Sequence, residues 1–224
     1  MQHGIAPRVR ALHPAPVSQL AAPVDRLSRQ IEFLVEVDKL KEVLRRTVVT
    51  QSRRAENSAE HTWHLCLVVV TLAEHANAPS LDLLRVLRML LIHDLVEIDA
   101  GDTFAYDAAG MVGQHEREAK AAARIFGLLP PDQAAEYRAL WDEFEAAATP
   151  EARFALACDR FQAMLLNART EGHAWKQHGV THDRVLARNA AVQHGSQAIW
   201  EYAVQMIDAC VARGHLPPAP AGKK

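Results

Sequence analysis

Apolar residues recur along most of the chain at the three- and four-residue spacing of amphipathic helices, and strict alternation of apolar and polar residues is almost absent. The first such pattern predicts a helix over about residues 25–45, with apolar positions at Leu27, Ile31, Leu34, Leu40 and Leu44. Asn57 or Ser58 can cap a second helix, because their side-chain oxygens accept hydrogen bonds from the first backbone N–H groups. The apolar positions of this second helix are Leu65, Val68, Val69 and Leu72.

Capping and helix-breaking residues place the later helices. Ser80 can cap a third helix, which is expected to run as far as Gly101. Thr149 can cap another that starts at Pro150, since proline suits the first helical position. Further helices are expected over about residues 114–126, 132–147, 182–193 and 195–213. With no internal repeat, the pattern predicts an all-α, single-domain helical bundle.

The two ends of the chain differ from its middle. Residues 1–24 are rich in proline and alanine and predict a disordered leader, and residues 215–224 predict a flexible tail. The folded bundle is therefore expected over residues 25–214. No apolar run is long enough to suggest a membrane span or a secretory signal.

Charge and cysteine content narrow the class of protein. The 224 residues carry 25 basic and 27 acidic side chains, for a net charge of −2. We therefore expect neither a nucleic acid polymer nor an anionic membrane as a partner, although a local patch could bind one small anion. Cys66, Cys158 and Cys210 lie far apart within apolar helical patterns, which indicates reduced core residues in a cytoplasmic protein.

The segment LLIHDLVEIDAGDTF, residues 90–104, places ionisable groups directly after two apolar turns. It contains His93 and Asp94, followed by Glu97, Asp99 and Asp102. A buried charge is unfavourable unless it is compensated, so these groups require solvent, basic partners or a metal ion.

Two residues elsewhere could complete a metal site with His93 and Asp94. His61 lies in the first turns of the second predicted helix, and Asp159 interrupts an apolar helix face. Together the four side chains form a set of two imidazoles and two carboxylates from three helices. Such a set suits one divalent ion, and Mn, Co, Fe, Ni, Mg and Zn all remain open. Four protein ligands also leave positions for water, as a hydrolase requires.

The order His61…His93-Asp94…Asp159 resembles the metal motif of the HD-domain phosphohydrolases. Four blocks carry the resemblance into the branch that contains the 5′-deoxynucleotidases: RAENSAEHTWHL, LLIHDLVEIDAGDTFAYD, LWDEFEA and EARFALACDRFQ. Together they extend over roughly residues 31–210. The resemblance implies a helical HD-domain fold, one divalent metal ion bound by these four residues, and a homodimer. It also implies a small-molecule nucleotide, or another phosphomonoester, as substrate.

Two further acids are candidates for catalysis on a phosphomonoester. Glu97 lies three residues after Asp94 on the same helix, where it can accept the proton of the attacking water and later protonate the leaving alkoxide. Asp102 follows Gly101 and could orient that water or hydrogen-bond a ligating histidine. The residues at both positions are essential acids in the resembling family. We therefore expect a divalent-metal-dependent phosphomonoesterase that acts on (deoxy)nucleoside 5′-monophosphates.

A dianionic phosphate also needs cationic partners, and arginines precede the ENSAEH block. In the resembling family an Arg-Trp pair here helps to select the 5′-phosphate and a sugar without a 2′-hydroxyl. By position Arg46 matches that arginine, so we expect it to bind substrate, whereas Thr47 stands in place of the tryptophan. The preference between deoxyribose and ribose is therefore left open. His64 is the main rival metal ligand and is expected to be a supporting or buried polar group instead.

Other functions remain possible at this point. An HD-type phosphodiesterase with two metals would need additional histidine ligands, and only His115 lies between Asp94 and Asp159. A non-catalytic, metal-containing module that senses a ligand would not need Glu97 or Asp102. Separately, helices carrying Trp141, Trp175 and Trp200 could form a dimer face; this is compatible with catalysis, and tryptophan is more often a core residue.

Overall fold

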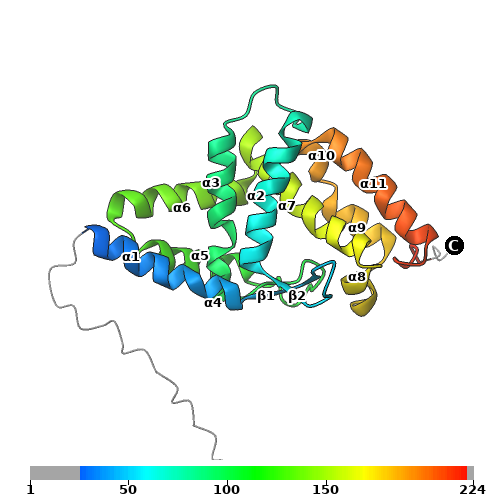
Figure 1. Ribbon diagram of the computed structural model, residues 1–224, viewed down its shortest axis with the longest axis horizontal. Helices are drawn as coiled ribbons and strands as arrows, with labels where there is room; N and C mark the ends of the chain where they lie inside the picture. Colours follow the sequence, from blue (N-terminus) through cyan, green and yellow to red (C-terminus); the bar gives the residue numbers. More distant parts are fainter. Residues whose placement is uncertain (1–25, 221–224) are drawn as a thin grey trace, which may run out of the picture.

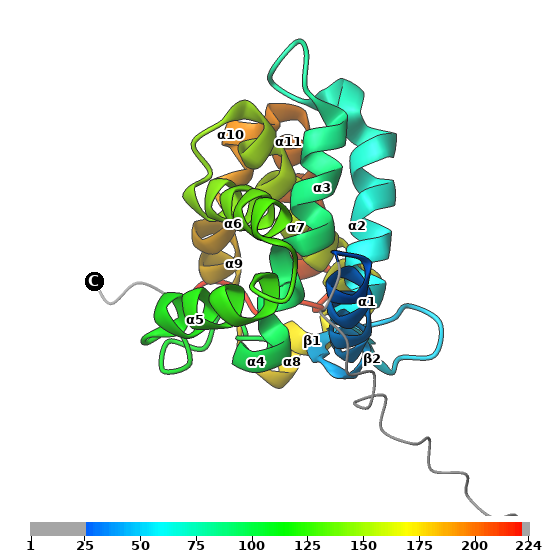
Figure 2. The same cartoon turned by 90° about the vertical axis from the view of Figure 1, so that its left-hand side faces the viewer.

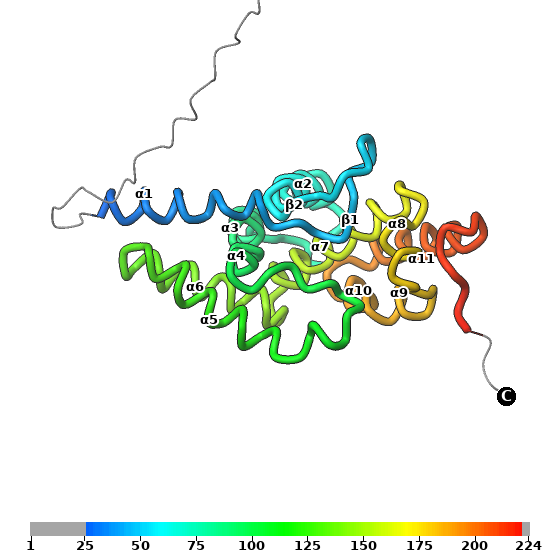
Figure 3. Tube along the Cα trace, turned by 90° about the horizontal axis from the view of Figure 1, so that it is seen from below, coloured from blue at the N-terminus to red at the C-terminus, as the bar shows by residue number. Residues whose placement is uncertain are grey.

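The computed structural model describes residues 26–220, so the expected leader at residues 1–24 and the last four residues lie outside the described residues. The described chain is a bundle of helices with one two-stranded sheet (Figures 1–3). The predicted all-α class is confirmed. Within this part of the chain, no helix combines the length and apolar character that crossing a membrane requires.

The first predicted helix is wrong in its second half. Helix α1 runs over Arg26–Val37 and continues as a 3-10 helix, η1, over Asp38–Glu42. The chain then forms strand β1, Leu44–Val48, which pairs antiparallel with β2, Ala55–Asn57. The run from Thr47 to Val49 is β-branched and favours an extended backbone over a helix. The end of β1 packs against the bundle, where Thr47 and Val48 are both buried.

The predicted cap of α2, Ser58–Leu72, is present in full. The Asn57 side chain accepts a hydrogen bond from the Glu60 backbone N–H at 2.9 Å, and the Glu60 carboxylate accepts one from the Asn57 N–H at 3.2 Å. This reciprocal arrangement is the capping box, which fixes where the helix starts. The helix is followed by a 3-10 turn, η2, over Ala73–His75.

The third predicted helix is shorter than expected at both ends. Asp82, and not Ser80, caps α3, which covers Leu83–His93. The backbone then tightens into a 3-10 turn, η3, over Asp94–Val96, and a short helix, α4, over Glu97–Ala100 leads to Gly101. The change from α to 3-10 winding therefore falls between His93 and Asp94.

The remaining helices follow the predictions with two differences. Helices α5 (Gln114–Phe126), α6 (Pro131–Ala146) and α7 (Pro150–Arg169) agree closely, and Thr149 caps α7 through the Ala152 N–H. A short helix that was not foreseen, α8, covers His173–Gln177. The predicted helix at 182–193 is divided into α9 (His182–Asn189) and α10 (Val192–Gly195), and α11 covers Gln197–Ala212.

Helix α7 is the centre of the bundle, and it contacts α2, α3, α6, α10 and α11 (Figures 1 and 2). The largest side chains buried around it include Trp141, Trp175 and Phe154. Two of the tryptophans considered for a dimer face are thus core residues, because burying an indole ring against the bundle removes a large apolar area from water. Trp63 on α2, which was not considered for that face, is exposed, with 66% of its surface accessible.

The end of the described chain packs against the bundle. Leu216 is only 1% exposed, and the Pro217 carbonyl accepts a hydrogen bond from the His182 N–H at 2.9 Å. The packed structure therefore continues past residue 214, where the bundle was expected to end. This end passes directly over Gly172, the left-handed residue before α8.

Two glycines with almost the same φ angle test this packing. Gly172 and Gly214 have φ of +72° and +69°, but a Cβ on Gly172 would overlap the His215 carbonyl oxygen, whereas Gly214 faces open space. Gly214→Ala is expected to lower the free energy of unfolding by about 1 kcal/mol through left-handed strain. Gly172→Ala is expected to cost about 2 kcal/mol more through overpacking. Urea unfolding of both variants measures the difference, and equal losses would contradict the packing of this end.

Candidate metal centre

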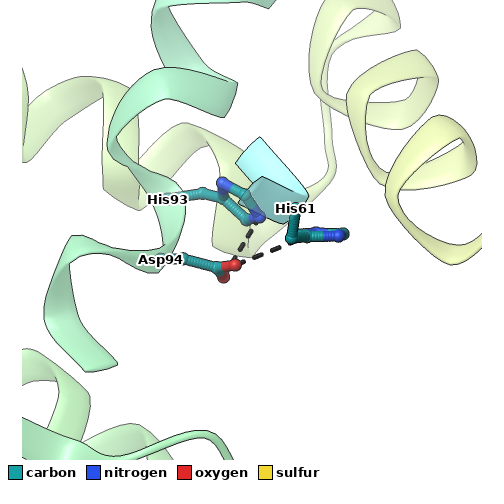
Figure 4. Close-up of side chains that lie close together, drawn as sticks. All are labelled: His61, His93 and Asp94. Atoms are coloured by element: carbon teal, nitrogen blue, oxygen red, sulfur yellow. Dashed lines mark ion pairs between the residues drawn. The ribbon is translucent and has the colours of Figure 1, made fainter. Parts of the chain in front are cut away.

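Three of the four predicted metal ligands converge in the structure. His61 comes from α2, His93 is the last residue of α3, and Asp94 begins η3; one ligand atom from each lies within 4.8 Å of the others (Figure 4). Neighbouring side chains on a regular helix diverge by about 100°. The switch to 3-10 winding at Asp94 changes this direction, and the Asp94 carboxylate lies 3.1 Å from His93 Nε2.

Asp159 on α7 reaches the same point. Its Oδ1 lies 3.0 Å from His61 Nε2, and Asp94 Oδ2 lies 3.8 Å from that nitrogen. The structure thus brings all four predicted ligands together from three parts of the bundle. That they bind a metal remains a prediction.

The protonation of His93 is set by the backbone. Its Nδ1 lies 2.7 Å from the Leu90 carbonyl oxygen, which can only accept, so Nδ1 carries the hydrogen. The lone pair is therefore on Nε2. This atom is buried and has no hydrogen-bond partner among the described residues, although it points at the Asp94 carboxylate.

The orientation of His61 is set by a buried chain of hydrogen bonds that the sequence did not reveal. Gln162 donates from Nε2 to Glu56 Oε1 at 2.8 Å, so its amide oxygen faces His61 Nδ1 at 2.9 Å. His61 Nδ1 must therefore donate, which again leaves the lone pair on Nε2. Thr47 completes the chain by donating to Glu56 Oε2 at 2.8 Å. The available signal was Gln162 itself, a polar residue one turn after Asp159 on an apolar helix.

His64 lies behind this arrangement and not among the ligands. Its Nδ1 is 3.2 Å from Gln162 Nε2, on the side of the amide away from His61 Nδ1. This is the supporting position that was expected for it.

The donor set fits a divalent cation. Two imidazole lone pairs and two carboxylates face one point, and burial lowers the pKa of His61 to about 4 and also lowers that of His93. Both rings are therefore neutral near pH 7, which is the form that binds metals. Burial, together with Asp159 and Asp102, raises the pKa of Asp94 to about 8 although Arg45 opposes the shift. A cation at this point would relieve that crowding of negative charge.

Arg45 is a second residue that sequence reasoning undervalued. Its Nη1 donates to Asp94 Oδ2 at 2.8 Å and lies 3.9 Å from Glu97 and 4.0 Å from Asp102. Burial disfavours the charged guanidinium, but these carboxylates raise the pKa of Arg45 above its usual value. Arg46, the predicted substrate-binding residue, is exposed, and it lines the same cavity.

Glu97 and Asp102 both line this cavity, as the prediction required. Ser58 Oγ donates to Glu97 Oε2 at 2.6 Å, which orients the carboxyl group. Burial, reinforced by the Asp94 charge, raises the pKa of Glu97 well above its usual value, and burial also raises that of Asp102. A raised pKa moves a carboxyl group toward the range in which general acids and bases exchange protons. Asp99 by contrast is paired with Arg124 on the surface.

The cavity has a volume of about 510 Å³, which is within the range of small-molecule sites. It extends from His93, Asp94 and Asp159 along α7 toward α8 and α9. The site is therefore a concave pocket with converging ionisable groups at one end.

This fold and site are those of an HD-domain protein, and residues 37–200 match the HD domain family. The chain belongs to that family. It is 30% identical to the 5′-deoxynucleotidase HDDC2 of Bos taurus over 152 residues, which cover 65% of this chain and 72% of the relative. It is 26% identical to the 5′-deoxynucleotidase HDDC2 of Danio rerio over 140 residues, covering 62% and 68% respectively.

A solved structure is also similar over most of the chain. It is a "Predicted metal-dependent phosphohydrolase" from Magnetospirillum magnetotacticum MS-1, with 54% identity and a TM-score of 0.83. The match covers 86% of this chain and 96% of that one. The predicted resemblance to the HD-domain phosphohydrolases, in the branch of the 5′-deoxynucleotidases, is confirmed.

The raised pKa of Asp94 predicts that metal binding strengthens with pH. The folded, metal-free protein keeps this proton up to about pH 8, whereas the usual pKa is 3.8. The folded state thus binds more protons between these values and loses stability as the pH rises through them. A bound cation displaces the proton, so the affinity for Mn²⁺ is expected to rise by up to about tenfold per pH unit below about pH 8. Titration calorimetry in two buffers of different ionisation enthalpy measures affinity and proton release; a pH-independent affinity would contradict this.

Gln162 is expected to support metal binding without touching the ion. Gln162→Met keeps the size of the side chain but removes the acceptor that holds His61 Nδ1–H, so the ring loses its fixed tautomer. Mn²⁺ affinity is expected to fall by about 10–100-fold, as for other residues that orient metal ligands. Gln177→Met, at the end of α8 and outside this chain of hydrogen bonds, is the control. Unchanged affinity in a folded Gln162→Met protein would show that the amide does not orient His61.

Proposed function

We propose that this HD-domain hydrolase uses one divalent metal ion to release phosphate from (deoxy)nucleoside 5′-monophosphates by the attack of water. The carrying observation is the convergence of two imidazole lone pairs and two carboxylates, with His93 Nε2 buried and unpartnered. In the proposal His61, His93, Asp94 and Asp159 hold the ion. Such an ion polarises a phosphate oxygen and lowers the pKa of water.

Glu97 is the proposed general base and acid. Its carboxyl group lies beside Asp94 on the cavity wall and is oriented by the Ser58 hydroxyl. In its ionised form it accepts the proton of the attacking water, and it then protonates the leaving 5′-oxygen of the nucleoside. Asp102, on the same wall and 4.0 Å from Arg45, is proposed to orient the water.

Two neighbouring arginines are proposed to bind the phosphate. Arg46 stands at the exposed edge of the cavity, where it meets the incoming dianion, and Arg45 lies deeper beside Asp94. Guanidinium groups bind phosphate oxygens through two parallel hydrogen bonds, which fixes the direction of the phosphate as well as its position. The phosphorus atom is thereby held facing Glu97.

The proposal includes a cytoplasmic homodimer. All three cysteines are free, which suits a reducing compartment. Helices α1 and α2 expose large apolar side chains that a partner could cover, namely Leu27, Ile31, Leu34, Val35, Trp63, Leu67 and Val70. The balanced charge gives no support for a nucleic acid polymer or an anionic membrane as partner.

Phosphate release tests the proposal directly. Metal-stripped protein is given Mn²⁺, Co²⁺, Ni²⁺, Fe²⁺ or Mg²⁺ and a panel of 5′- and 3′-mononucleotides, both ribo and deoxy. We expect metal-dependent release from the 5′-monophosphates. Glu97→Gln is expected to lower kcat by about 10²–10⁴-fold with metal binding retained, since it removes the proton acceptor.

Asp99→Asn is the matched control, because this nearby acid pairs with Arg124 on the surface. It is expected to keep the full rate. No release with any metal, from protein shown to bind one, would contradict the proposal and favour a metal-containing module that senses a ligand. Equal rates for Glu97→Gln and the unaltered protein would remove Glu97 from the mechanism.

A further inference from the structure

The cavity continues beyond the predicted ligands along one stripe of α7. Arg160 and Asn167 both line it. They are seven residues apart on one regular helix, so they share a face and lie about 10 Å apart along its axis. This part of the cavity, bounded also by Phe104, Tyr106 and Trp175, is called the distal arm here.

Both polar residues of this stripe carry a buried atom without a hydrogen-bond partner among the described residues. Asn167 is 7% exposed; its Nδ2 donates to the Ala163 carbonyl at 3.0 Å, but its Oδ1 accepts nothing. Arg160 Nη1 donates to the Arg188 carbonyl at 2.7 Å, but its Nε–H donates to nothing. Buried polar atoms are normally paired, so a free acceptor and a free donor on two residues that line the cavity are open to partners that a bound ligand would supply.

Aromatic side chains also line the distal arm. The Tyr106 hydroxyl accepts hydrogen bonds from Asn189 Nδ2 at 3.3 Å and from the Trp175 side chain, which holds its ring in place. The Phe104 ring lies 5.3 Å from that of Tyr106 between centroids. Fixed aromatic side chains are the surfaces on which proteins stack nucleobases.

The charge of the distal arm is positive. Neither Arg160 nor Arg188, which also lines the cavity, forms an ion pair within the described part of the chain. A guanidinium group donates most strongly to oxygen acceptors such as a base carbonyl, whereas it repels an exocyclic amino group. With Nδ2 engaged, Asn167 offers only its acceptor, which suits a ring N–H.

We propose that the distal arm binds the nucleobase and prefers bases in which a carbonyl adjoins a ring N–H, namely guanine, thymine and uracil, over adenine and cytosine. Arg160 donates to the carbonyl, Asn167 accepts from the ring N–H, and the base stacks against the aromatic side chains. This inference rests on the proposed function, which places the phosphate at the other end of the cavity.

The test compares kcat/KM for the 5′-monophosphates of deoxyguanosine, thymidine, deoxyadenosine and deoxycytidine, with 2-deoxyribose 5-phosphate as a substrate that lacks a base. We expect at least a tenfold preference for the first two over the next two, and a larger one over the base-free substrate. Asn167→Leu and Arg160→Gln are each expected to bring the ratio between deoxyguanosine and deoxyadenosine monophosphates close to one. Arg169→Gln, an exposed change on the same helix, is expected to keep the ratio.

A purely structural role for Asn167 predicts a different result. Asn167→Leu removes an unpartnered buried acceptor, so its melting temperature is expected not to fall; a lower melting temperature with an unchanged ratio would overturn the inference. Equal rates on all four nucleotides, or faster release from nucleoside 3′,5′-bisphosphates without base preference, would also overturn it. Faster release from the bisphosphates would assign Arg160 and Arg188 to the binding of a second phosphate.

The outcomes also separate this inference from the proposed function. Release from all substrates without base preference leaves the phosphatase standing and removes the base site. If no substrate releases phosphate, equilibrium binding of the same four nucleotides to metal-loaded protein decides the inference by itself. Equal or undetectable binding would then overturn it, and tighter binding of the first two would support it.

Discussion

Buried negative charge is the constraint on which the structure of the site depends. Asp94, Glu97 and Asp102 line one cavity within a helical core, and Asp159 approaches them from α7. Removing such groups from water is unfavourable unless opposite charges or hydrogen-bond donors replace it. Arg45 supplies one positive charge, and the two histidine lone pairs leave room for another. Because the ligands come from α2, the α3–η3 junction and α7, this compensation exists only when the bundle is packed.

The β-hairpin connects this charge balance to the orientation of His61. Strand β1 carries both Arg45 and Thr47, and β2 carries Glu56. Arg45 reaches Asp94, whereas Thr47 and Glu56 hold Gln162 and, through it, the imidazole. The two-stranded sheet thus places the Arg45 guanidinium beside Asp94 and also fixes the tautomer of His61. Thr47 is engaged by Glu56 here, so the residue in the place of the expected tryptophan belongs to the support of the metal site.

Features fixed by local chemistry were predictable, and those fixed by distant pairing were not. Asn57 and Thr149 were recognised as caps because a cap acts within one helical turn. The hairpin was missed because Leu40 and Leu44 fit a helical spacing. In the structure β1 is held by its pairing with β2, which follows a turn at Arg53, where φ is +60°. A helix over these residues could not show that Arg45 reaches Asp94 while Arg46 stays at the exposed edge of the same cavity. The candidate ligand set could be assembled because its order in the sequence is distinctive, whereas Gln162 and Glu56 act only through contacts across the fold.

The same crowding of negative charge that favours a cation also acts on Glu97, the proposed catalytic acid and base. Burial raises the pKa of both Asp94 and Glu97, and the Asp94 charge raises the pKa of Glu97 further. A divalent charge beside them favours the ionised form of both groups, because the ion adds the largest local positive charge. A bound metal ion would therefore lower the pKa of Glu97 again and favour the ionised carboxylate, which can act as a base. The histidines, the hairpin and Arg45 would therefore all influence the proposed catalysis in the same way, by changing the charge that surrounds Asp94 and Glu97.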